Sequence, residues 1–247
     1  MLSNVLFCIL YIQMTRKDEF KKITIAIDGP AASGKSTTAK SVAHKLGYLH
    51  IDTGAMYRAI TLKALDEKID LSDKKEIVRL AQTSAVRLEV EDGTTKVFLD
   101  GNEVTKRIRT QLVNRSVSTV SSYEGVRDVM VQEQKKMASI GGVVLEGRDI
   151  GTVVLPKAEL KIFMVASVEE RARRRKKDLA LVGIEAHQDD LVKEIDARDK
   201  KDSTRETSPL RKASDAIELD TSNLTIEEQV DFILERAKDI IRKKEKS

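Results

Sequence analysis

The chain has 247 residues, of which 40% are hydrophobic and 34% are charged, as in an ordinary globular protein, and its net charge of +4 is mild. Four Tyr, five Phe and no Trp leave little for the stacking surfaces of a nucleic-acid-binding protein, whereas an anionic small-molecule substrate suits the basic balance. Cys8 is the single cysteine, which excludes an internal disulfide and favours a reducing, cytoplasmic location, and His44, His50 and His187 lack the spacing of metal ligands.

Residues 1–22 differ in pattern from the rest of the chain. Their apolar run, "LSNVLFCILYI", is too short for a membrane-spanning helix, which needs about 20 residues, and it lacks the basic segment and cleavage site of a signal peptide. We interpret residues 1–22 as an N-terminal extension outside the fold, with translation starting at Met14. A weak membrane-associating tail is the alternative, and N-terminal sequencing of the native protein distinguishes the two.

Strands and helices alternate after this extension. Residues 23–28 ("ITIAID") and 48–52 ("YLHID") predict buried strands. The helix between them begins at Lys35 and stops at Gly47, a residue that readily adopts the left-handed conformation of a helix end. Asp73 has the spacing of a helix cap before another short helix.

The apolar period then changes from that of a helix to that of strands. Residues 85–104 alternate with period two around Asp92-Gly93 and Asp100-Gly101, which are hairpin turn signals. Further predicted elements are helices over 107–120 and 123–139, strands at "VVLEG" and "LKIFMVA", a very polar helical stretch over 168–204, a strand at "AIELD" and a helix over 225–243. The fold class predicted is α/β, a doubly wound parallel sheet with a small inserted antiparallel β element.

A phosphate-binding loop follows the first strand. "GPAASGKS" satisfies the pattern G-x-x-x-x-G-K-[ST] and opens a helix, so its backbone N–H groups can surround an anion. Lys35 would reach the β- and γ-phosphates, and the Ser36 hydroxyl would bind Mg²⁺. The predicted ATP-binding residues are Gly29, Pro30, Ala31, Ala32, Ser33, Gly34, Lys35, Ser36 and Thr37, with Ser36 as the metal ligand.

The loop alone does not identify the phosphate acceptor. A GTPase switch is disfavoured because the guanine-reading pattern N/T-K-x-D is absent. ATP hydrolysis stays open, since the strand "VVLEG" ends near a carboxylate, Glu146. A kinase would need a second anion site, built from arginines far apart in sequence, because the guanidinium fork matches phosphate oxygens.

Three further motifs carry a family resemblance. "DTGAMYR" (52–58), "EGRDIGT" (146–152) and "RDKKDSTR" (198–205), together with the phosphate loop, resemble the bacterial cytidylate kinases. The resemblance spans residues 23–245 and implies a single P-loop kinase domain, with a monophosphate-binding insert at about 83–120 and a mobile lid at about 168–205. It further implies Mg²⁺-dependent transfer from ATP to CMP, with dCMP as a second substrate, in a monomer that engages neither nucleic acid nor membrane.

The resemblance also implies residue roles. Thr53, Arg58, Arg148 and Arg205 match the acceptor-phosphate clamp, Ser118, Arg127 and Asp149 match the base-reading residues, and Arg198 and Asp202 match the residues that hold the ribose and the end of the lid. Lys35, Arg148, Arg174 and Arg205 are the predicted catalytic residues. Glu146 is either a residue that supports its neighbours or one that helps to place Mg²⁺ through water. The competing interpretation is that several of these residues are ordinary surface or packing residues.

The base-reading roles make chemical sense. A carboxylate at Asp149 accepts from the N4 amino group of cytosine, while Arg127 donates to ring N3 and the carbonyl. Uracil presents the opposite groups, so both pairings would fail. The sequence therefore predicts a strong preference for CMP over UMP.

The segment "EERARRRKKD" (169–178) is strongly basic. Most of its side chains are expected to be solvated, and the resemblance favours Arg171 or Arg174 as the lid arginine that contacts the transferred phosphate. The alternatives for the whole protein are another small-molecule P-loop kinase, of the UMP, AMP or shikimate type, and a regulatory P-loop ATPase.

Overall fold

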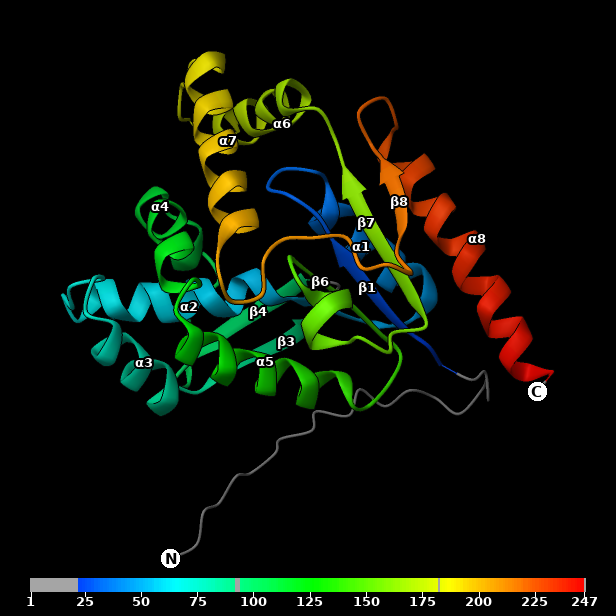
Figure 1. Ribbon diagram of the computed structural model, residues 1–247, viewed down its shortest axis with the longest axis horizontal. Coiled ribbons are helices and arrows are strands. Elements are labelled where there is room, and N and C mark those ends of the chain that lie inside the picture. Colours follow the sequence, from blue (N-terminus) through cyan, green and yellow to red (C-terminus); the bar gives the residue numbers. More distant parts are fainter. Residues whose placement is uncertain (1–21, 92–93, 182, 247) are drawn as a thin grey trace, which may run out of the picture.

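The computed structural model describes residues 22–91, 94–181 and 183–246, so the expected N-terminal extension lies outside the described residues apart from Lys22. At its centre is a sheet of five parallel strands in the order β2-β6-β1-β7-β8 (Figure 1). The strands are β1 (Thr24–Asp28), β2 (Leu49–Asp52), β6 (Val143–Gly147), β7 (Leu160–Val165) and β8 (Ile217–Asp220). The predicted α/β class with a parallel sheet is confirmed.

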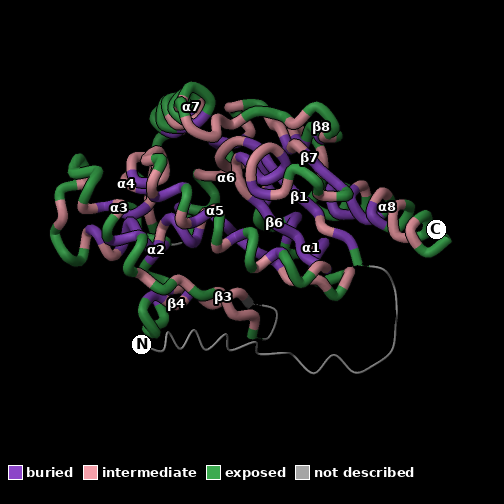
Figure 2. Tube along the Cα trace, turned by 60° about the horizontal axis from the view of Figure 1, so that its bottom comes forward, coloured by how far each residue is buried: buried purple, intermediate pink, exposed green. Residues whose placement is uncertain are grey.

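Helices cover the sheet on both faces. α1 (Lys35–Leu46) and α8 (Ile226–Glu245) pack together on one face, where Ile25 and Ile27 of β1 join their core, while Ala26 points into a second core on the other face. Side chains of a strand alternate between the two faces, so a continuous apolar run is what such a doubly covered strand requires. The tube in Figure 2 shows the resulting buried centre with exposed helix surfaces around it.

A second layer of helices is formed by α2 (Thr53–Asp66), α3 (Lys74–Thr83) and α5 (Glu124–Ala138), which share an apolar core. Asp52 caps α2 by accepting from the Ala55 N–H at 3.0 Å, and Asp73 caps α3 in the same way. Gly47 ends α1 with a left-handed φ of 64°, as predicted. Within the part of the chain that is described, no helix combines the length and apolar character needed to cross a membrane.

The insert is an antiparallel sheet of β3 (Val86–Glu91), β4 (Thr94–Leu99) and β5 (Asn102–Glu103), which confirms the predicted β element. The predicted helix over 107–120 is interrupted: a short turn, η1 (Arg107–Arg109), precedes α4 (Gln111–Val120), because Thr110 has an extended backbone. An apolar cluster joins this region to α2. The insert is thereby held beside the carboxyl end of β2.

The segment predicted to be a lid forms two helices, α6 (Val168–Ala180) and α7 (Gln188–Thr204), rather than the single helical stretch that the composition indicated. The turn between them contains Gly183, whose φ of 75° favours glycine. The two helices share a small apolar core of their own, formed by Ala172, Leu179, Leu191 and Ile195. Figure 1 shows the lid beyond the carboxyl ends of the sheet strands, which is where sites form in open parallel sheets.

Candidate active site

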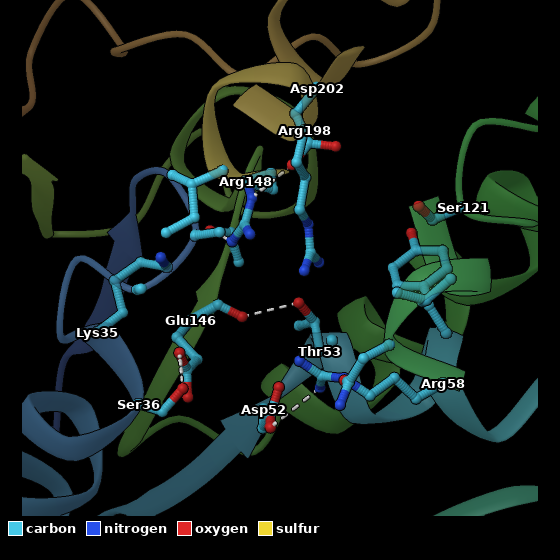
Figure 3. A pocket seen from close by; sticks show the side chains of 18 of the residues that line it. Lys35, Ser36, Asp52, Thr53, Arg58, Ser121, Glu146, Arg148, Arg198 and Asp202 are labelled. Carbon is cyan, nitrogen blue, oxygen red and sulfur yellow. Dashed lines mark hydrogen bonds and ion pairs between the residues drawn. The ribbon is translucent and has the colours of Figure 1, made fainter. Parts of the chain in front are cut away.

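A cavity of about 260 Å³ lies where the phosphate loop, the start of α2, α4, the segment after β6 and the lid helices meet. Figure 3 shows side chains from these separate elements pointing into it. The predicted site residues that line the cavity are Ala31, Ala32, Lys35, Ser36, Thr53, Arg58, Arg127, Arg148, Asp149, Arg198, Asp202 and Arg205. Residues distributed over most of the chain are therefore brought to one place.

The phosphate loop forms one wall of the cavity. Gly29 has a φ of 149°, and a Cβ there would lie 2.1 Å from the carbonyl oxygen of Met164, so the tight turn requires glycine. Lys35 Nζ donates to the Pro30 carbonyl at 2.5 Å. Burial, reinforced by repulsion from Arg148, lowers the pKa of Lys35 to about 7. The remaining loop residues, Gly29, Pro30, Ser33, Gly34 and Thr37, shape this wall without lining the cavity.

Ser36 is bound to a buried carboxylate. Its hydroxyl donates to Glu146 Oε2 at 2.7 Å, and His50 Nε2 lies 3.0 Å from Glu146 Oε1. A hydroxyl and a carboxylate are the hard oxygen groups that suit Mg²⁺ near phosphates, so the residues fit this ion. No cluster of three or more His, Cys, Asp or Glu among the described residues could hold a metal alone. His50 is nine-tenths buried beside Glu146.

The predicted phosphate clamp is anchored by carboxylates. Asp52 Oδ2 lies 3.7 Å from Arg58 Nη1 and accepts from Arg109 Nη2 at 2.8 Å. Burial alone would raise the pKa of Asp52, but these two arginines hold it at about 2, so the carboxylate stays ionised. Arg148 Nε donates to Asp202 Oδ2 at 2.9 Å. The position of Asp202 beside Arg148 agrees with a role at the end of the lid.

The predicted base-reading pair is in contact. Arg127 Nη2 donates to Asp149 Oδ2 at 2.5 Å in a buried setting, and Arg205 Nη2 lies 3.9 Å from Asp149 Oδ1. The Arg127 guanidinium also lies over the Tyr57 ring, 5.4 Å from its centroid. Ser118, the third predicted base-reading residue, does not line the cavity, whereas Ser121, which follows the same helix, does. The Ser118 hydroxyl is buried and makes no hydrogen bond in the described structure.

Several buried donors at the cavity make no hydrogen bond in the described structure. They are the Nε atoms of Arg58, Arg127 and Arg198, Nη1 of Arg58, Nη2 of Arg205 and the Tyr57 hydroxyl. A buried polar group without a hydrogen bond costs about 1–3 kcal/mol, so such a cluster is expected to be satisfied by a ligand. Because almost all of these groups are cationic donors, that ligand should be anionic and rich in acceptors.

The predicted lid arginines, Arg171 and Arg174, do not line this cavity. Arg174 Nη2 donates to the carbonyl oxygen of Thr221 at 2.5 Å, and its Nε donates to Glu170 at 2.8 Å. Arg171 is paired with Asp199 and donates to the Ala31 carbonyl. Arg175, the next residue along α6, lines the cavity instead. Consecutive residues of a helix point about 100° apart, so a one-residue difference changes which guanidinium faces the site.

Sequence reasoning also missed other residues that line the cavity. Among them are Tyr57, Asn114, Ser121, Asp178 and Glu194. Tyr57 lies within the quoted motif "DTGAMYR" and could have been found there. Asp178 and Glu194 carry no local signal, because only the packing of α6 against α7 turns them toward the site.

Comparison with known proteins agrees with this geometry. The family model described as cytidylate kinase matches residues 25–239. The chain belongs to the cytidylate kinase family. It is 52% identical over 215 residues to the cytidylate kinase of Bacillus subtilis (strain 168), covering 87% of this chain and 96% of that relative. The cytidylate kinases of Bacillus licheniformis and Pediococcus pentosaceus are each 53% identical, over 87% and 86% of this chain and 96% and 94% of their own lengths.

The region matched by the cytidylate kinase model contains the phosphate loop, the insert, both lid helices and every predicted site residue. The predicted membership of this family is thereby confirmed.

Proposed function

We propose that the protein is a cytidylate kinase that transfers a phosphoryl group from ATP to CMP, giving ADP and CDP, with dCMP as a second acceptor. The observation that carries the proposal is the set of buried arginine N–H groups without a hydrogen bond, which line one cavity together with the phosphate loop. An ATPase has no need of a second anion site, whereas a nucleoside-monophosphate kinase does.

The chain supplies two phosphate sites. Lys35 and the N–H groups of the phosphate loop hold the β- and γ-phosphates of ATP. Arg58, Arg148 and Arg205 hold the phosphate of CMP, and Arg175 adds positive charge near the transferred group. The attacking phosphate oxygen is already anionic, so the transfer requires no general base. Catalysis rests on alignment of the two phosphates and on stabilisation of their charge.

Magnesium is the expected partner of ATP. Ser36 would hold the ion, and Glu146, which accepts the Ser36 hydroxyl, would keep that side chain in place. When bound, Mg²⁺ neutralises part of the phosphate charge.

Base selection is assigned to Asp149 and Arg127. Asp149 Oδ1, which lies 3.9 Å from Arg205 Nη2, is the oxygen left to accept from the cytosine amino group. Arg127 keeps an unpartnered Nε, although its Nη2 is taken up by Asp149.

The test is a coupled assay of ADP release with CMP, dCMP, UMP, AMP or no acceptor. We expect release only with an acceptor, fastest with CMP or dCMP. Equal release without an acceptor would indicate an ATPase, and a preference for AMP or UMP would contradict the base-reading roles.

We also propose that the enzyme acts as a cytoplasmic monomer. The large apolar side chains exposed among the described residues, Leu112, Ile140, Leu181, Ile217 and Ile226, are distributed over separate elements. Light scattering should give the mass of one chain, 27.6 kDa, and a dimer mass would contradict this.

A further inference from the structure

Asp28 lies between the phosphate loop and the segment that carries Arg148 and Asp149. It ends β1 and directly precedes Gly29, the first residue of the phosphate loop. Its side chain is buried, with the residue only 5% exposed. Neither the phosphate clamp nor the base-reading pair includes it.

The Asp28 carboxylate binds the backbone of the opposite loop. Oδ1 accepts from the Ile150 N–H at 2.8 Å, and Oδ2 accepts from the Gly151 N–H at 2.7 Å. These N–H groups open the turn η2 (Ile150–Val154), whose own capping residue, Asp149, makes no side-chain cap bond. A helical turn begins with N–H groups that need acceptors from outside the turn, and here the carboxylate at the end of β1 accepts from two of them.

These bonds fix the segment that carries Arg148 and Asp149. On one side of the pair, Gly147 is held by its parallel register with Asp28 in the sheet. On the other side, Ile150 and Gly151 are held by the Asp28 side chain. The fit at Gly151 is close, because a Cβ there would lie 3.2 Å from Lys161 Cδ and 3.4 Å from Asp28 Oδ2.

We propose that Asp28 is a positioning residue, which orients Arg148 and Asp149 toward the acceptor nucleotide by fixing the backbone on which both are carried. Since the same residue leads into the phosphate loop, it also fixes the position of the segment that carries Arg148 and Asp149 relative to the phosphate loop. This role rests on the proposed kinase function. Asp28 acts through its neighbours and contacts neither nucleotide.

The test compares steady-state kinetics of the wild-type enzyme, Asp28→Asn and a matched control, Glu159→Gln. Asn keeps the size of the side chain but replaces one acceptor oxygen with an N–H₂ group that faces a backbone N–H. Glu159 is the control because its carboxylate also accepts a backbone N–H of β1, from Thr24 at 2.8 Å, but at the far end of the strand.

We expect Asp28→Asn to raise KM for CMP by about tenfold or more, as one charged hydrogen bond is lost, while KM for ATP stays within about twofold. Calorimetry should find the same loss in CMP binding. The control should leave both KM values within about twofold. An unchanged KM for CMP would overturn the proposal. Equal rises in KM for CMP and for ATP would also overturn it, because they indicate a general disturbance of the fold.

Gly151→Ala provides a second variant if Asp28→Asn does not fold. It keeps the carboxylate but crowds the bonded turn, and we expect KM for CMP to rise without a matching change for ATP. An unaffected KM for CMP would contradict the proposal. If the wild-type enzyme itself lacks CMP-dependent ADP release, the proposed function fails, whereas normal wild-type activity with unaffected variants overturns only the role of Asp28.

Discussion

Three arginines that line the proposed acceptor site are each held by a carboxylate. Asp52 faces Arg58, Asp202 binds Arg148, and Asp149 binds Arg127. Cations fixed in this way need little rearrangement when an anion binds, and such pre-organisation is the main source of electrostatic catalysis. The carboxylates therefore serve the site by orienting positive charge rather than by neutralising it.

Replacement of Asp149 by Asn should weaken the choice between bases. The amide can donate to the O4 of uracil, which the carboxylate repels, so we expect the ratio of kcat/KM for CMP to that for UMP to fall by about 10²-fold or more. Parallel kinetics with both nucleotides measure this. Asp189→Asn, on the surface of the lid, is the matched control and should leave the ratio unchanged. Unchanged discrimination in Asp149→Asn would refute the assignment.

Asp28 should make stability depend on pH. Burial raises the pKa of Asp28 to about 6, although the N–H groups of Gly151 and Ile150 oppose the shift, and Asp149 and Lys35 are the charged groups that act on it. Lys161 lies beside the same turn. An unfolded Asp loses its proton near pH 4. Between about pH 4 and pH 6 the folded chain thus retains a proton that the unfolded chain has lost, and stability falls as pH rises.

The size of this effect is about 3 kcal/mol, from a pKa difference of about two. Urea denaturation of both proteins should therefore show that the free energy of unfolding of the wild type, relative to that of Asp28→Asn, falls between pH 4 and pH 7. Glu159→Gln should show the opposite trend, with the wild type losing its advantage as pH falls below about 4.5, because the pKa of Glu159 is lowered, burial being outweighed by Lys244 and the Thr24 N–H. A pH-independent difference for Asp28→Asn would contradict the prediction.

At the scale of elements, the lid is the part best suited to movement. Its helices α6 and α7 pack mainly against each other over a small apolar core, and Lys201 of α7 donates a hydrogen bond to Thr119 Oγ1 of α4 at 3.1 Å. Segments with few apolar anchors open at low free-energy cost. We therefore expect the predicted lid to close over the site and to exclude water during transfer.

Arg175 is expected to act on the transferred phosphate. We expect Arg175→Ala to lower kcat by about 10²-fold, since loss of one donor to a developing charge has this scale. KM for CMP should change much less. Arg173→Ala is the matched control, because Arg173 lies on the same helix, is about half exposed and pairs with Glu170. Equal kcat values for the two variants would show that Arg175 does not reach the reacting group.

At the scale of the whole molecule, the arginines that line the cavity repel one another electrostatically. The pKa of Arg198 is lowered to about 10 by burial and by the nearby Arg148. An anion that enters the cavity relieves this repulsion and satisfies the unpartnered donors. Ligand binding should consequently stabilise the entire fold.

CMP at 100 times its dissociation constant should raise the free energy of unfolding by about 2.7 kcal/mol. UMP at the same concentration should stabilise the protein less, because its base cannot satisfy Asp149 and Arg127. Chemical denaturation with each nucleotide measures both values. Equal stabilisation by CMP and UMP would mean that only the phosphate is recognised in the ground state.

Much of this molecule follows from local sequence patterns. The strands, the antiparallel insert and the phosphate loop were predictable because apolar period, turn residues and glycine geometry act over a few neighbouring residues. The closeness of Arg127 and Asp149 was predictable only through the family resemblance. Helix boundaries near Thr110 and Gly183 were not predicted, since backbone breaks in polar segments leave a weak pattern.

The sequence by itself determined the α/β class, the ATP loop and the family, because these depend on residue type and spacing along the chain. Tertiary structure alone decided which side chains from distant parts of the chain meet. It places Arg175 rather than Arg174 at the cavity, His50 beside Glu146, Arg109 on Asp52, and Asp28 against the backbone of Ile150. The physical reason is that each of these contacts depends on the relative placement of whole elements. Such placement is set by packing between distant segments and leaves no periodic trace in the sequence.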